Sequence, residues 1–457
     1  MGLRVLNRER LLRQVPGGGP LLDAYEAALA AVHPSRLLPR LVRPLGGGCL
    51  ELADGGRLCG SGVYVAGFGK AARSMAEAVH ELLGDAVEAG VVIAPRGMGG
   101  RVGPIEVLEG DHPVPGGATL RSSLRLLEFL QEVPRDALLL VLVSGGGSAL
   151  FEVPAPGLEL EDIAEATGLL MAAGADIYEL NAVRKHLSAV KGGQLLRHTR
   201  ARPVLGLYMS DVPGDRLDTI ASGPTVPDPT TYMDAYDALN SHGLWGRVPE
   251  RVRERILAGL RGEAPETPKP GDPVFQGTAN ALSGRNRDAL MAAAKKLQAA
   301  GYHPLVLTDT LRGEAREAAK AVASILESMA QGPLAEKGYT ALVAGGETTV
   351  TVEGRGRGGR SQELCLSLAL GLNRLRLVER YAALCAGTDG VDGNSPAAGA
   401  VVDQDTIPRA RELGLDPRRF LEENDSYSFF QRLGQWLNTG GYTGVNVNDI
   451  IVAVIEK

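Results

Sequence analysis

Unbroken apolar runs that end at glycine recur along this chain. In the clearest of them, Leu138–Val143, six apolar residues lead directly into Ser144-Gly145-Gly146-Gly147-Ser148. A short apolar run without alternation is typical of a strand buried on both faces, as in the middle of a parallel sheet. Similar runs predict further strands over residues 62–66, 90–94, 105–108, 203–209, 303–307, 339–344, 380–386 and 450–455.

Between these strands, apolar residues recur every three or four positions, which predicts helices. The helices are expected over residues 72–83, 119–132, 160–174, 284–300, 312–331 and 361–372. Alternating positions over 348–352 predict an edge strand. Strands that alternate with helices indicate two α/β domains with largely parallel sheets flanked by helices. Because residues 262–277 contain four prolines, we expect a linker there and domains at 1–265 and 266–457.

Glycine-rich polar loops follow the predicted strands, at the sheet edge where open α/β proteins bind ligands. After residues 144–148, a second loop covers 67–72, Gly-Phe-Gly-Lys-Ala-Ala, and places Lys70 at a helix N-terminus. Glycines let the backbone approach a ligand closely and helix N-termini attract anions, so both loops predict anion binding. The alternative is that both loops are packing turns and that Lys70 is a solvated charge.

The loop 67–72 also matches the G-x-G-x-x-A fingerprint of dinucleotide sites. That fingerprint requires an acidic residue at the end of the next strand, where this chain has Pro95 and Arg96. It is not a Walker A loop either, since Ala71 stands where Ser or Thr is required. Lys70 is one of only nine lysines beside 39 arginines, which suggests that this position needs a compact ammonium.

A third polar segment covers residues 179–193. Arg184, Ser188 and Lys191 have the spacing of one helical face, and Asn181 lies on the same side. A cationic face that leads into Gly192-Gly193 predicts phosphate or carboxylate binding. The alternative is a surface helix with its charges turned outward.

Carboxylates and arginines follow other predicted strands. Asp211 and Asp215 come just after strand 203–209 and suit Mg²⁺ or a proton acceptor; the alternative is a pair of turn-forming aspartates. The loop 354–360 holds three arginines in a glycine frame before a helix, which predicts an oxyanion clamp. Arg360 is nearest to the helix and is the preferred residue. The alternative is an exposed, flexible loop.

Composition excludes several classes of partner. The net charge is −6 over 457 residues and no basic face is implied, so nucleic acid and anionic membranes are poor partners. No apolar stretch approaches the roughly 18 residues of a membrane span. No pair among the four cysteines has metal-ligand spacing, and Cys365 and Cys385 lie in apolar patterns typical of a core. These features fit a cytoplasmic protein.

Taken in order, the motifs resemble those of the glycerate 2-kinase family, also called the MOFRL family after its C-terminal domain. The resemblance covers nearly the whole chain and rests on residues 144–149, 179–193, 210–215, 221–231, 345–364, 387–393, 424–430 and 443–449. It implies a Rossmann-like N-terminal domain, a C-terminal MOFRL domain and an active site in the cleft between them. It also implies that the γ-phosphoryl group of ATP is transferred, with Mg²⁺, to the 2-hydroxyl of D-glycerate, giving 2-phosphoglycerate and ADP.

The family's active-site lysine and arginine match Lys70 and Arg360. The chain departs from the family pattern at Ser361, where Asn is usual, at Ala344, where Ser is usual, and at Gly441-Tyr442. Because Arg360 is intact, we expect activity.

The residue pattern and the resemblance together predict a set of roles. Catalysis is assigned to Lys70, Arg360 and Asp211. The ATP phosphates are expected on Ser144, Gly145, Gly146, Gly147, Ser148, Lys191 and Gly192. D-Glycerate is expected on Gly69, Asn181, Arg184 and Glu347. Mg²⁺ is expected on Asp211, Asp215 and Asp389.

Two other functions are weighed against the kinase. Relatives of the family are often named as NAD(P)H-dependent hydroxypyruvate reductases, and Arg96 could meet a 2′-phosphate, but the ribose carboxylate is missing. A non-catalytic anion-binding protein is disfavoured by the number of polar strand-end loops. We expect D-glycerate and ATP as partners, no nucleic acid or membrane, and a homodimer as one option.

Overall fold

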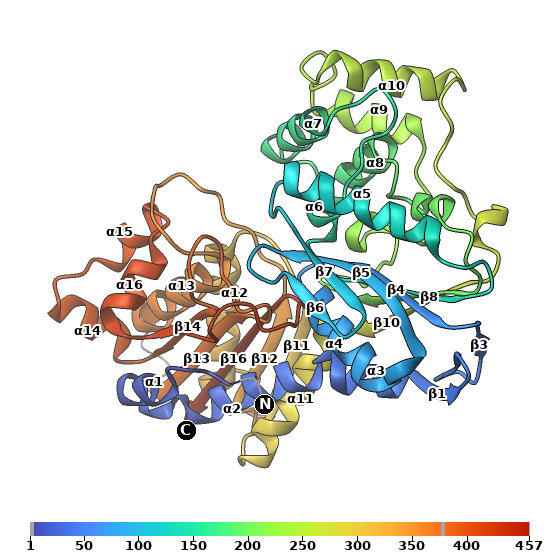
Figure 1. Ribbon diagram of the computed structural model, residues 1–457. Coiled ribbons are helices and arrows are strands. Elements are labelled where there is room, and N and C mark those ends of the chain that lie inside the picture. Colours follow the sequence, from blue (N-terminus) through green and yellow to red (C-terminus); the bar gives the residue numbers. More distant parts are fainter. Residues whose placement is uncertain (1–3, 376–379, 457) are drawn as a thin grey trace. The chain divides into compact units, whose positions relative to one another are not determined.

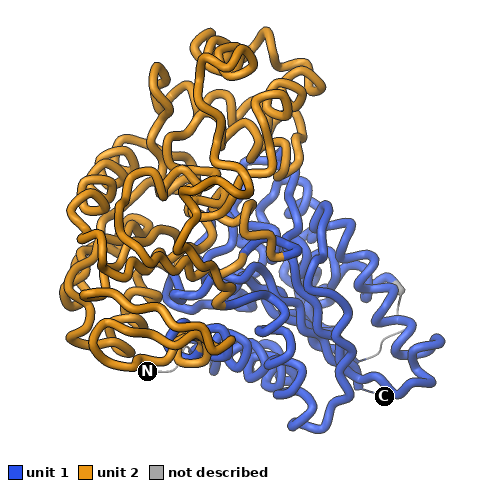
Figure 2. Tube along the Cα trace, turned by 90° about the vertical axis from the view of Figure 1, so that its right-hand side faces the viewer, with its two compact units in different colours: residues 1–36, 211–214, 284–457 blue, residues 37–210, 215–283 orange. Residues whose placement is uncertain are grey.

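The computed structural model describes residues 4–375 and 380–456 of the chain (Figure 1). The chain divides into two compact units (Figure 2). Unit 1 comprises Met1–Arg36, Asp211–Gly214 and Gly284–Lys457, and unit 2 comprises Leu37–Ser210 and Asp215–Ser283. These bounds differ from the predicted domains at 1–265 and 266–457.

A seven-stranded sheet forms the centre of unit 2. In spatial order its strands are β10 (Thr278–Gly284), β9 (Val204–Met209), β8 (Leu138–Val143), β4 (Val63–Phe68), β5 (Val87–Pro95), β7 (Ile105–Gly110) and β6 (Gly100–Val102). The strands from β9 through β8, β4 and β5 to β7 pair in parallel, and β6 is antiparallel to β7. The predicted central strand is β8, and all its residues are buried.

Two groups of helices belong to unit 2. The helices α4 (Ala72–Leu83) and α5 (Gly117–Glu132) follow β4 and β7, as the apolar periodicity predicts. A second group gathers at one end of the unit around an apolar core of its own (Figure 1). It consists of α7 (Leu160–Ala172), α8 (Ile177–Leu187), α9 (Tyr232–Ser241) and α10 (Glu250–Leu260).

The expected linker at 262–277 is instead packed onto unit 2. Thr267 is buried and donates a hydrogen bond to Asp228 Oδ2 at 2.9 Å. Glu266 Oε1 lies 2.7 Å from His186 Nε2. The linker prediction is wrong because side chains at sequence-distant positions hold this proline-rich segment in place.

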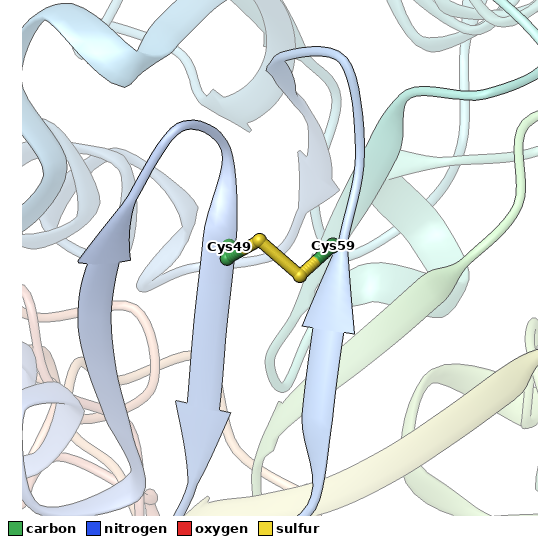
Figure 3. Close-up of a disulfide and its surroundings, with 2 residues drawn as sticks. All are labelled: Cys49 and Cys59. Carbon is green, nitrogen blue, oxygen red and sulfur yellow. A yellow bond between two sulfur atoms is a disulfide. The ribbon is translucent and has the colours of Figure 1, made fainter.

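A small antiparallel sheet of unit 2 carries a disulfide. Its strands are β1 (Val42–Gly46), β2 (Cys49–Leu52) and β3 (Arg57–Cys59). Cys49 and Cys59 face each other in the β2–β3 register and are covalently joined (Figure 3). The cysteine spacing did not predict this bond. Cys365 and Cys385 are free and buried, as expected of core residues.

Unit 1 is built on a six-stranded mixed sheet. In spatial order its strands are β11 (Pro304–Leu311), β12 (Ala341–Gly346), β16 (Asp449–Glu456), β13 (Arg380–Gly387), β14 (Gly399–Asp403) and β15 (Trp436–Leu437). Only β11 and β12 pair in parallel; the other neighbours are antiparallel. Its main helices include α11 (Asn286–Ala299), α12 (Ala315–Gln331) and α13 (Arg360–Leu375). Within the described residues, every helix is too short or too polar to cross a lipid bilayer.

The first helices of the chain dock on unit 1. They are α1 (Arg8–Gln14) and α2 (Gly19–Ala31). Tyr25 is fully buried and its hydroxyl donates to the Gly387 carbonyl oxygen at 2.6 Å, which explains why the N-terminal residues group with the C-terminal half. The predicted edge strand at 348–352 is absent: Thr349 forms only an isolated bridge with Glu314.

Candidate active site

The loops after β4 and β8 lock into each other at the carboxyl edge of the unit 2 sheet. The backbone N–H of Ala71 donates to Ser144 Oγ at 3.0 Å, and the backbone N–H of Lys70 donates to the Gly145 carbonyl oxygen at 2.9 Å. Gly69 has a φ of +127°, and a Cβ at this position would overlap Ser144. Because only glycine fits this contact, the loops 67–72 and 144–148 pack directly against each other. Together they form one continuous surface, which we call the floor.

The side chain of Lys70 passes close to the glycines of the second loop. A Cβ at Gly146 would lie 3.1 Å from Lys70 Cγ and 3.1 Å from the ring of His112. The predicted residues Lys70, Gly69 and 144–148 are therefore brought together within unit 2. An open backbone beside an ammonium is an arrangement that suits phosphate groups.

Ser148 is linked to Asn181 through Ser222, a residue that was not predicted to belong to the site. Ser222 donates to Asn181 Oδ1 at 2.9 Å, and its Oγ lies 2.8 Å from Ser148 Oγ. Ser222 is fully buried and has a φ of +60°. Left-handed backbone at a residue other than glycine costs about 1–3 kcal/mol and clusters at functional sites. The sequence signal was the segment 221–225, Ala-Ser-Gly-Pro-Thr, after β9.

Lys191 does not share a helical face with Arg184, contrary to the prediction. The helix α8 ends at Leu187, and Ser188 has an extended backbone. Lys191 is buried, and its Nζ lies 2.5 Å from Glu152 Oε2. Burial lowers the pKa of Lys191, and the charge of Glu152 opposes that shift. The predicted ATP contact of Lys191 stays a prediction, and a phosphate there would compete with Glu152.

Arg184 differs from the other cations around it. Lys185 is paired with Asp228 at 3.0 Å and Lys191 with Glu152. In contrast, no hydrogen bond or ion pair of the Arg184 guanidinium is found among the described residues. Burial lowers the pKa of Arg184, while the charge of Glu152 acts in the opposite direction. A partly desolvated guanidinium with spare donors suits a carboxylate or a phosphate.

In unit 1, Arg360 is held by two carboxylates at the start of α13. Its guanidinium contacts Asp449 at 2.6 and 3.2 Å and Glu347 at 2.6 Å. Burial acts to lower the pKa of Arg360, but the charges of Asp449 and Glu347 outweigh it and raise the pKa above its ordinary value. The side chain of Glu347 is 41% exposed and that of Asp449 only 12%. An incoming anion can therefore replace Glu347 more readily than Asp449.

Two arginines of the predicted clamp, Arg357 and Arg360, have different partners. The guanidinium of Arg357 lies 4.9 Å from the centre of the Tyr427 ring, in a cation–π contact. Its backbone N–H donates to Asp425 Oδ1 at 2.9 Å. Arg357 thus helps to hold the loop, whereas Arg360 is joined to acidic groups.

Asp392 fixes the beginning of α13. Its two carboxylate oxygens accept the backbone N–H groups of Ser361 and Gln362 at 3.1 and 2.8 Å. Burial, and then the charge of Asp449, raise the pKa of Asp392 to about 7. Neither Asp392 nor Asp449 was assigned a role from the sequence, although both lie in the segments 387–393 and 443–449 that carry the resemblance.

The three aspartates predicted to hold Mg²⁺ lie in different settings. Asp211 belongs to unit 1, where Asn446 donates to its Oδ2 at 3.1 Å, and Asp215 belongs to unit 2. Carboxylate oxygens of Asp389 and Asp449 both lie next to Gly387. Within the described residues, no three His, Cys, Asp or Glu side chains are arranged to hold a metal ion. Mg²⁺ bound through phosphates and water needs only one or two carboxylates, so these assignments stay predictions.

Comparison with known proteins decides the family. Residues 20–257 match the model of a domain of unknown function, DUF4147, and residues 340–449 match the MOFRL family. The chain is 41% identical over 396 residues to the glycerate 2-kinase of Pyrococcus horikoshii, covering 86% of this chain and 88% of that relative. The chain belongs to the glycerate 2-kinase (MOFRL) family.

The structure of this chain is also similar to a solved structure. The crystal structure of glycerate kinase from Thermotoga maritima superposes with a TM-score of 0.79 at 36% identity, over 97% of this chain and 100% of that chain. The predicted α/β fold is thereby confirmed. The largely parallel sheet that was predicted is found in unit 2, whereas antiparallel neighbours predominate in the sheet of unit 1.

One relative carries a different name. A protein of Agrobacterium vitis, 39% identical over 393 residues and 86% of each chain, is provisionally named hydroxypyruvate reductase. In this chain, Arg96, the residue considered for a 2′-phosphate, is ion-paired with Asp111 at 2.6 Å. The strand β5 ends at Pro95, without a carboxylate for a ribose.

Proposed function

We propose that this protein is a kinase that transfers the γ-phosphoryl group of ATP to the 2-hydroxyl of D-glycerate, giving 2-phosphoglycerate and ADP. Family membership supports the substrate and the reaction type. The observation that carries the proposal is the floor formed by the interlocked loops at 67–72 and 144–148, with Lys70 beside it. Phosphoryl transfer depends mainly on positioning and charge neutralisation. The glycine backbone of the floor could position the phosphates of ATP, and Lys70 could neutralise their charge.

We assign the ATP phosphates to Gly145, Gly146, Gly147 and Ser148, with Lys70 neutralising the transferring group. Open glycine backbone allows phosphate oxygens to come close, and the ammonium of a lysine is a compact point charge. Asn181 and Arg184 lie in the same unit, and Asn181 reaches Ser148 through Ser222. The unpaired donors of Arg184 suit the carboxylate of glycerate.

Arg360 is the second cationic group of the proposal. Its raised pKa keeps it charged over the whole working range of an enzyme. Asp449 orients the guanidinium of Arg360. If a substrate anion replaced the more exposed Glu347, Arg360 would still be paired with Asp449. The prediction that groups of unit 1 and unit 2 serve one reaction stays a prediction.

Asp211 is the proposed proton acceptor for the 2-hydroxyl. A carboxylate near a strand end suits this role, and the hydrogen bond from Asn446 keeps one oxygen oriented. Mg²⁺, when bound, would neutralise phosphate charge, and Asp211, Asp215 and Asp389 are the carboxylates proposed to hold it.

The test is the reaction itself, with purified protein, ATP, Mg²⁺ and D-glycerate. We expect ADP release that depends on glycerate, and a product whose phosphorus signal is split by a single neighbouring proton, as on the 2-oxygen. Splitting by two protons would place the phosphate on the 3-oxygen and contradict the proposed position. A reaction without glycerate measures background hydrolysis of ATP.

The reductase is tested in the same preparation. Because Arg96 is paired and the ribose carboxylate is missing, we expect no oxidation of NADH or NADPH with hydroxypyruvate. Oxidation of NADPH without any glycerate-dependent ADP release would replace the kinase by the reductase.

A further inference from the structure

Unit 1 contains a large surface cavity that the proposed function does not use. It lies between α12, α13 and the segment from α14 (Thr406–Glu412) to α15 (Pro417–Glu422), drawn in orange and red in Figure 1. Its volume is about 1080 Å³. Small-molecule sites typically enclose about 300–1,000 Å³, so the cavity can accept an organic ligand. None of the residues assigned to ATP, glycerate or Mg²⁺ lines it.

The wall of the cavity contains five cationic side chains and three carboxylates, so its net charge is positive. Arg374, Arg411 and Arg418 line it from α13, α14 and α15, and among the described residues none of them has an ion-pair partner. The two other cations of the wall are ion-paired: Lys320 with Glu317 at 2.7 Å, and Arg316 with Glu363 at 3.2 Å. Each guanidinium can bind a phosphate through two parallel N–H donors, and three of them border the same space from three separate elements.

Two further carboxylates, those of Asp416 and Glu422, belong to the wall. The carboxylate of Asp416 accepts the backbone N–H of Arg418 at 3.0 Å and so caps α15. Leu370, Leu415 and Leu421 supply an apolar side. The cavity therefore combines phosphate-binding donors with a surface for a carbon skeleton.

We propose that this cavity is a second anion site, which binds a phosphorylated small molecule through Arg374, Arg411 and Arg418. Its existence does not depend on the kinase reaction, because the binding site and its residues are separate from those of the proposed function. A phosphate ester or a short polyphosphate carries the paired negative charges that the three guanidiniums match.

The wall residue Arg316 connects the cavity with the loop before Arg360. Arg316 contacts Glu363 Oε2 at 3.2 Å, and Glu363 Oε1 accepts from Asn424 at 2.6 Å. The Asn424 amide oxygen in turn accepts the backbone N–H groups of residues 353 and 354, at 2.9 and 2.8 Å. A phosphate that draws Arg316 toward the cavity acts on this chain of hydrogen bonds. We therefore expect occupancy to change the handling of glycerate as well.

Binding is tested by calorimetry with inorganic pyrophosphate, without Mg²⁺, on the full chain. The wild type is compared with the double variant Arg411→Ala/Arg418→Ala and with Arg419→Ala. Arg419 is the matched control, because it is an exposed arginine of α15 that does not line the cavity. Any binding at the ATP site is the same in all three proteins.

We expect the wild type and Arg419→Ala to bind one more equivalent of pyrophosphate than the double variant, or to bind about tenfold tighter, which corresponds to about 1.4 kcal/mol. Equal stoichiometry and affinity in all three proteins would overturn the site. If circular dichroism shows that the double variant is unfolded, Arg374→Gln, at the exposed end of α13, takes its place.

The link to Arg360 has its own readout. With ATP saturating, we expect pyrophosphate to shift the KM for glycerate in the wild type and Arg419→Ala more than in the double variant. Identical shifts would refute the link while leaving the binding result intact. If the wild type shows no glycerate-dependent activity even without pyrophosphate, this result would count against the proposed function and not against the proposed anion site.

Discussion

Arg360 keeps its charge and its direction because the sheet register places two carboxylates beside it. Gly346, the last residue of β12, pairs with Asp449, the first residue of β16, so Glu347 and Asp449 are neighbours by backbone geometry. The start of the helix is fixed separately by Asp392. An anion that meets Arg360 therefore finds a guanidinium that is already oriented, and little side-chain entropy remains to be lost.

The buried carboxylate of Asp392 predicts a dependence of stability on pH. Its pKa is about 7 in the folded protein, mainly through burial, against about 3.9 for an unfolded aspartate. Between these values the folded state holds a proton that the unfolded state has released, so this group stabilises at low pH and its contribution is lost as the pH rises toward 7. Asp392→Asn removes the titration.

Urea unfolding between pH 4.5 and 8 measures this effect. The free energy of unfolding of the wild type minus that of Asp392→Asn is expected to fall as the pH rises. Asp237→Asn, at an exposed carboxylate of α9, is the control for the loss of one carboxylate. A flat difference for Asp392→Asn would contradict the raised pKa.

Lys191 allows a structural and an ATP-binding role to be separated. Lys191→Met leaves the buried Glu152 uncompensated, and removal of one partner of such a pair costs about 3–5 kcal/mol of stability. The double variant Lys191→Met/Glu152→Gln is expected to recover most of that loss in urea unfolding. If its KM for ATP then equals that of the wild type, Lys191 does not bind ATP; a strongly raised KM supports the contact. Lys295→Met, on the surface of α11, is the control.

At the scale of elements, the interlocked loops explain why glycine recurs after the parallel strands of unit 2. The two loops come from the adjacent strands β4 and β8, and their backbones contact each other through Ser144 and Gly145. Side chains at the contact would push the loops apart. The same lack of side chains would leave room for the phosphate oxygens that we propose to bind here, so packing and the proposed binding would impose the same requirement.

Gly69→Ala tests the interlock. The φ of +127° is unfavourable for alanine, at a cost of about 1–3 kcal/mol, and the new Cβ would overlap Ser144. We expect a lower melting temperature and a large loss of glycerate-dependent ADP release. Gly84→Ala is the matched control, because Gly84 also has a positive φ, +51°, but has no atom within 4 Å of the new Cβ. Equal effects of the two substitutions would mean that backbone strain alone, and not the loop contact, is responsible.

Elements with a purely local signal could be predicted from the sequence. The strand β8 matches its prediction because burial on both faces leaves an unbroken apolar run. The end of α8 could not be predicted, since Ser188 leaves the helix and donates to Glu152 at 2.6 Å, a residue 36 positions away. The packing of 262–277 onto unit 2 has the same cause: its partners, such as Asp228, are remote in sequence.

The candidate site could be predicted only in part for a similar reason. Lys70 and Arg360 stand out because glycines surround them and because a known family shares them. Ser222, Asp392 and Asp449 did not, since a serine or aspartate in a loop has the same appearance in sequence whether it caps a helix, orients an arginine or meets solvent.

At the scale of the whole molecule, the two compact units divide the predicted site residues. Lys70 and Arg184 belong to unit 2, and Arg360 and Asp211 belong to unit 1. Residues 211–214 follow β9 directly yet count with unit 1, so the chain changes unit just after a strand end. The central functional prediction is that Lys70 and Arg360, 290 positions apart, act in one phosphoryl transfer.

A double-mutant cycle on glycerate-dependent ADP release tests that prediction most directly. It compares the wild type, Lys70→Ala, Arg360→Ala and the double variant, with Lys295→Ala as the control for loss of a lysine. Residues that act as a unit are strongly non-additive, so we expect each single variant to lose about 100-fold or more in kcat/KM and the double variant to lose little beyond that. Wild-type activity in both single variants would contradict the account.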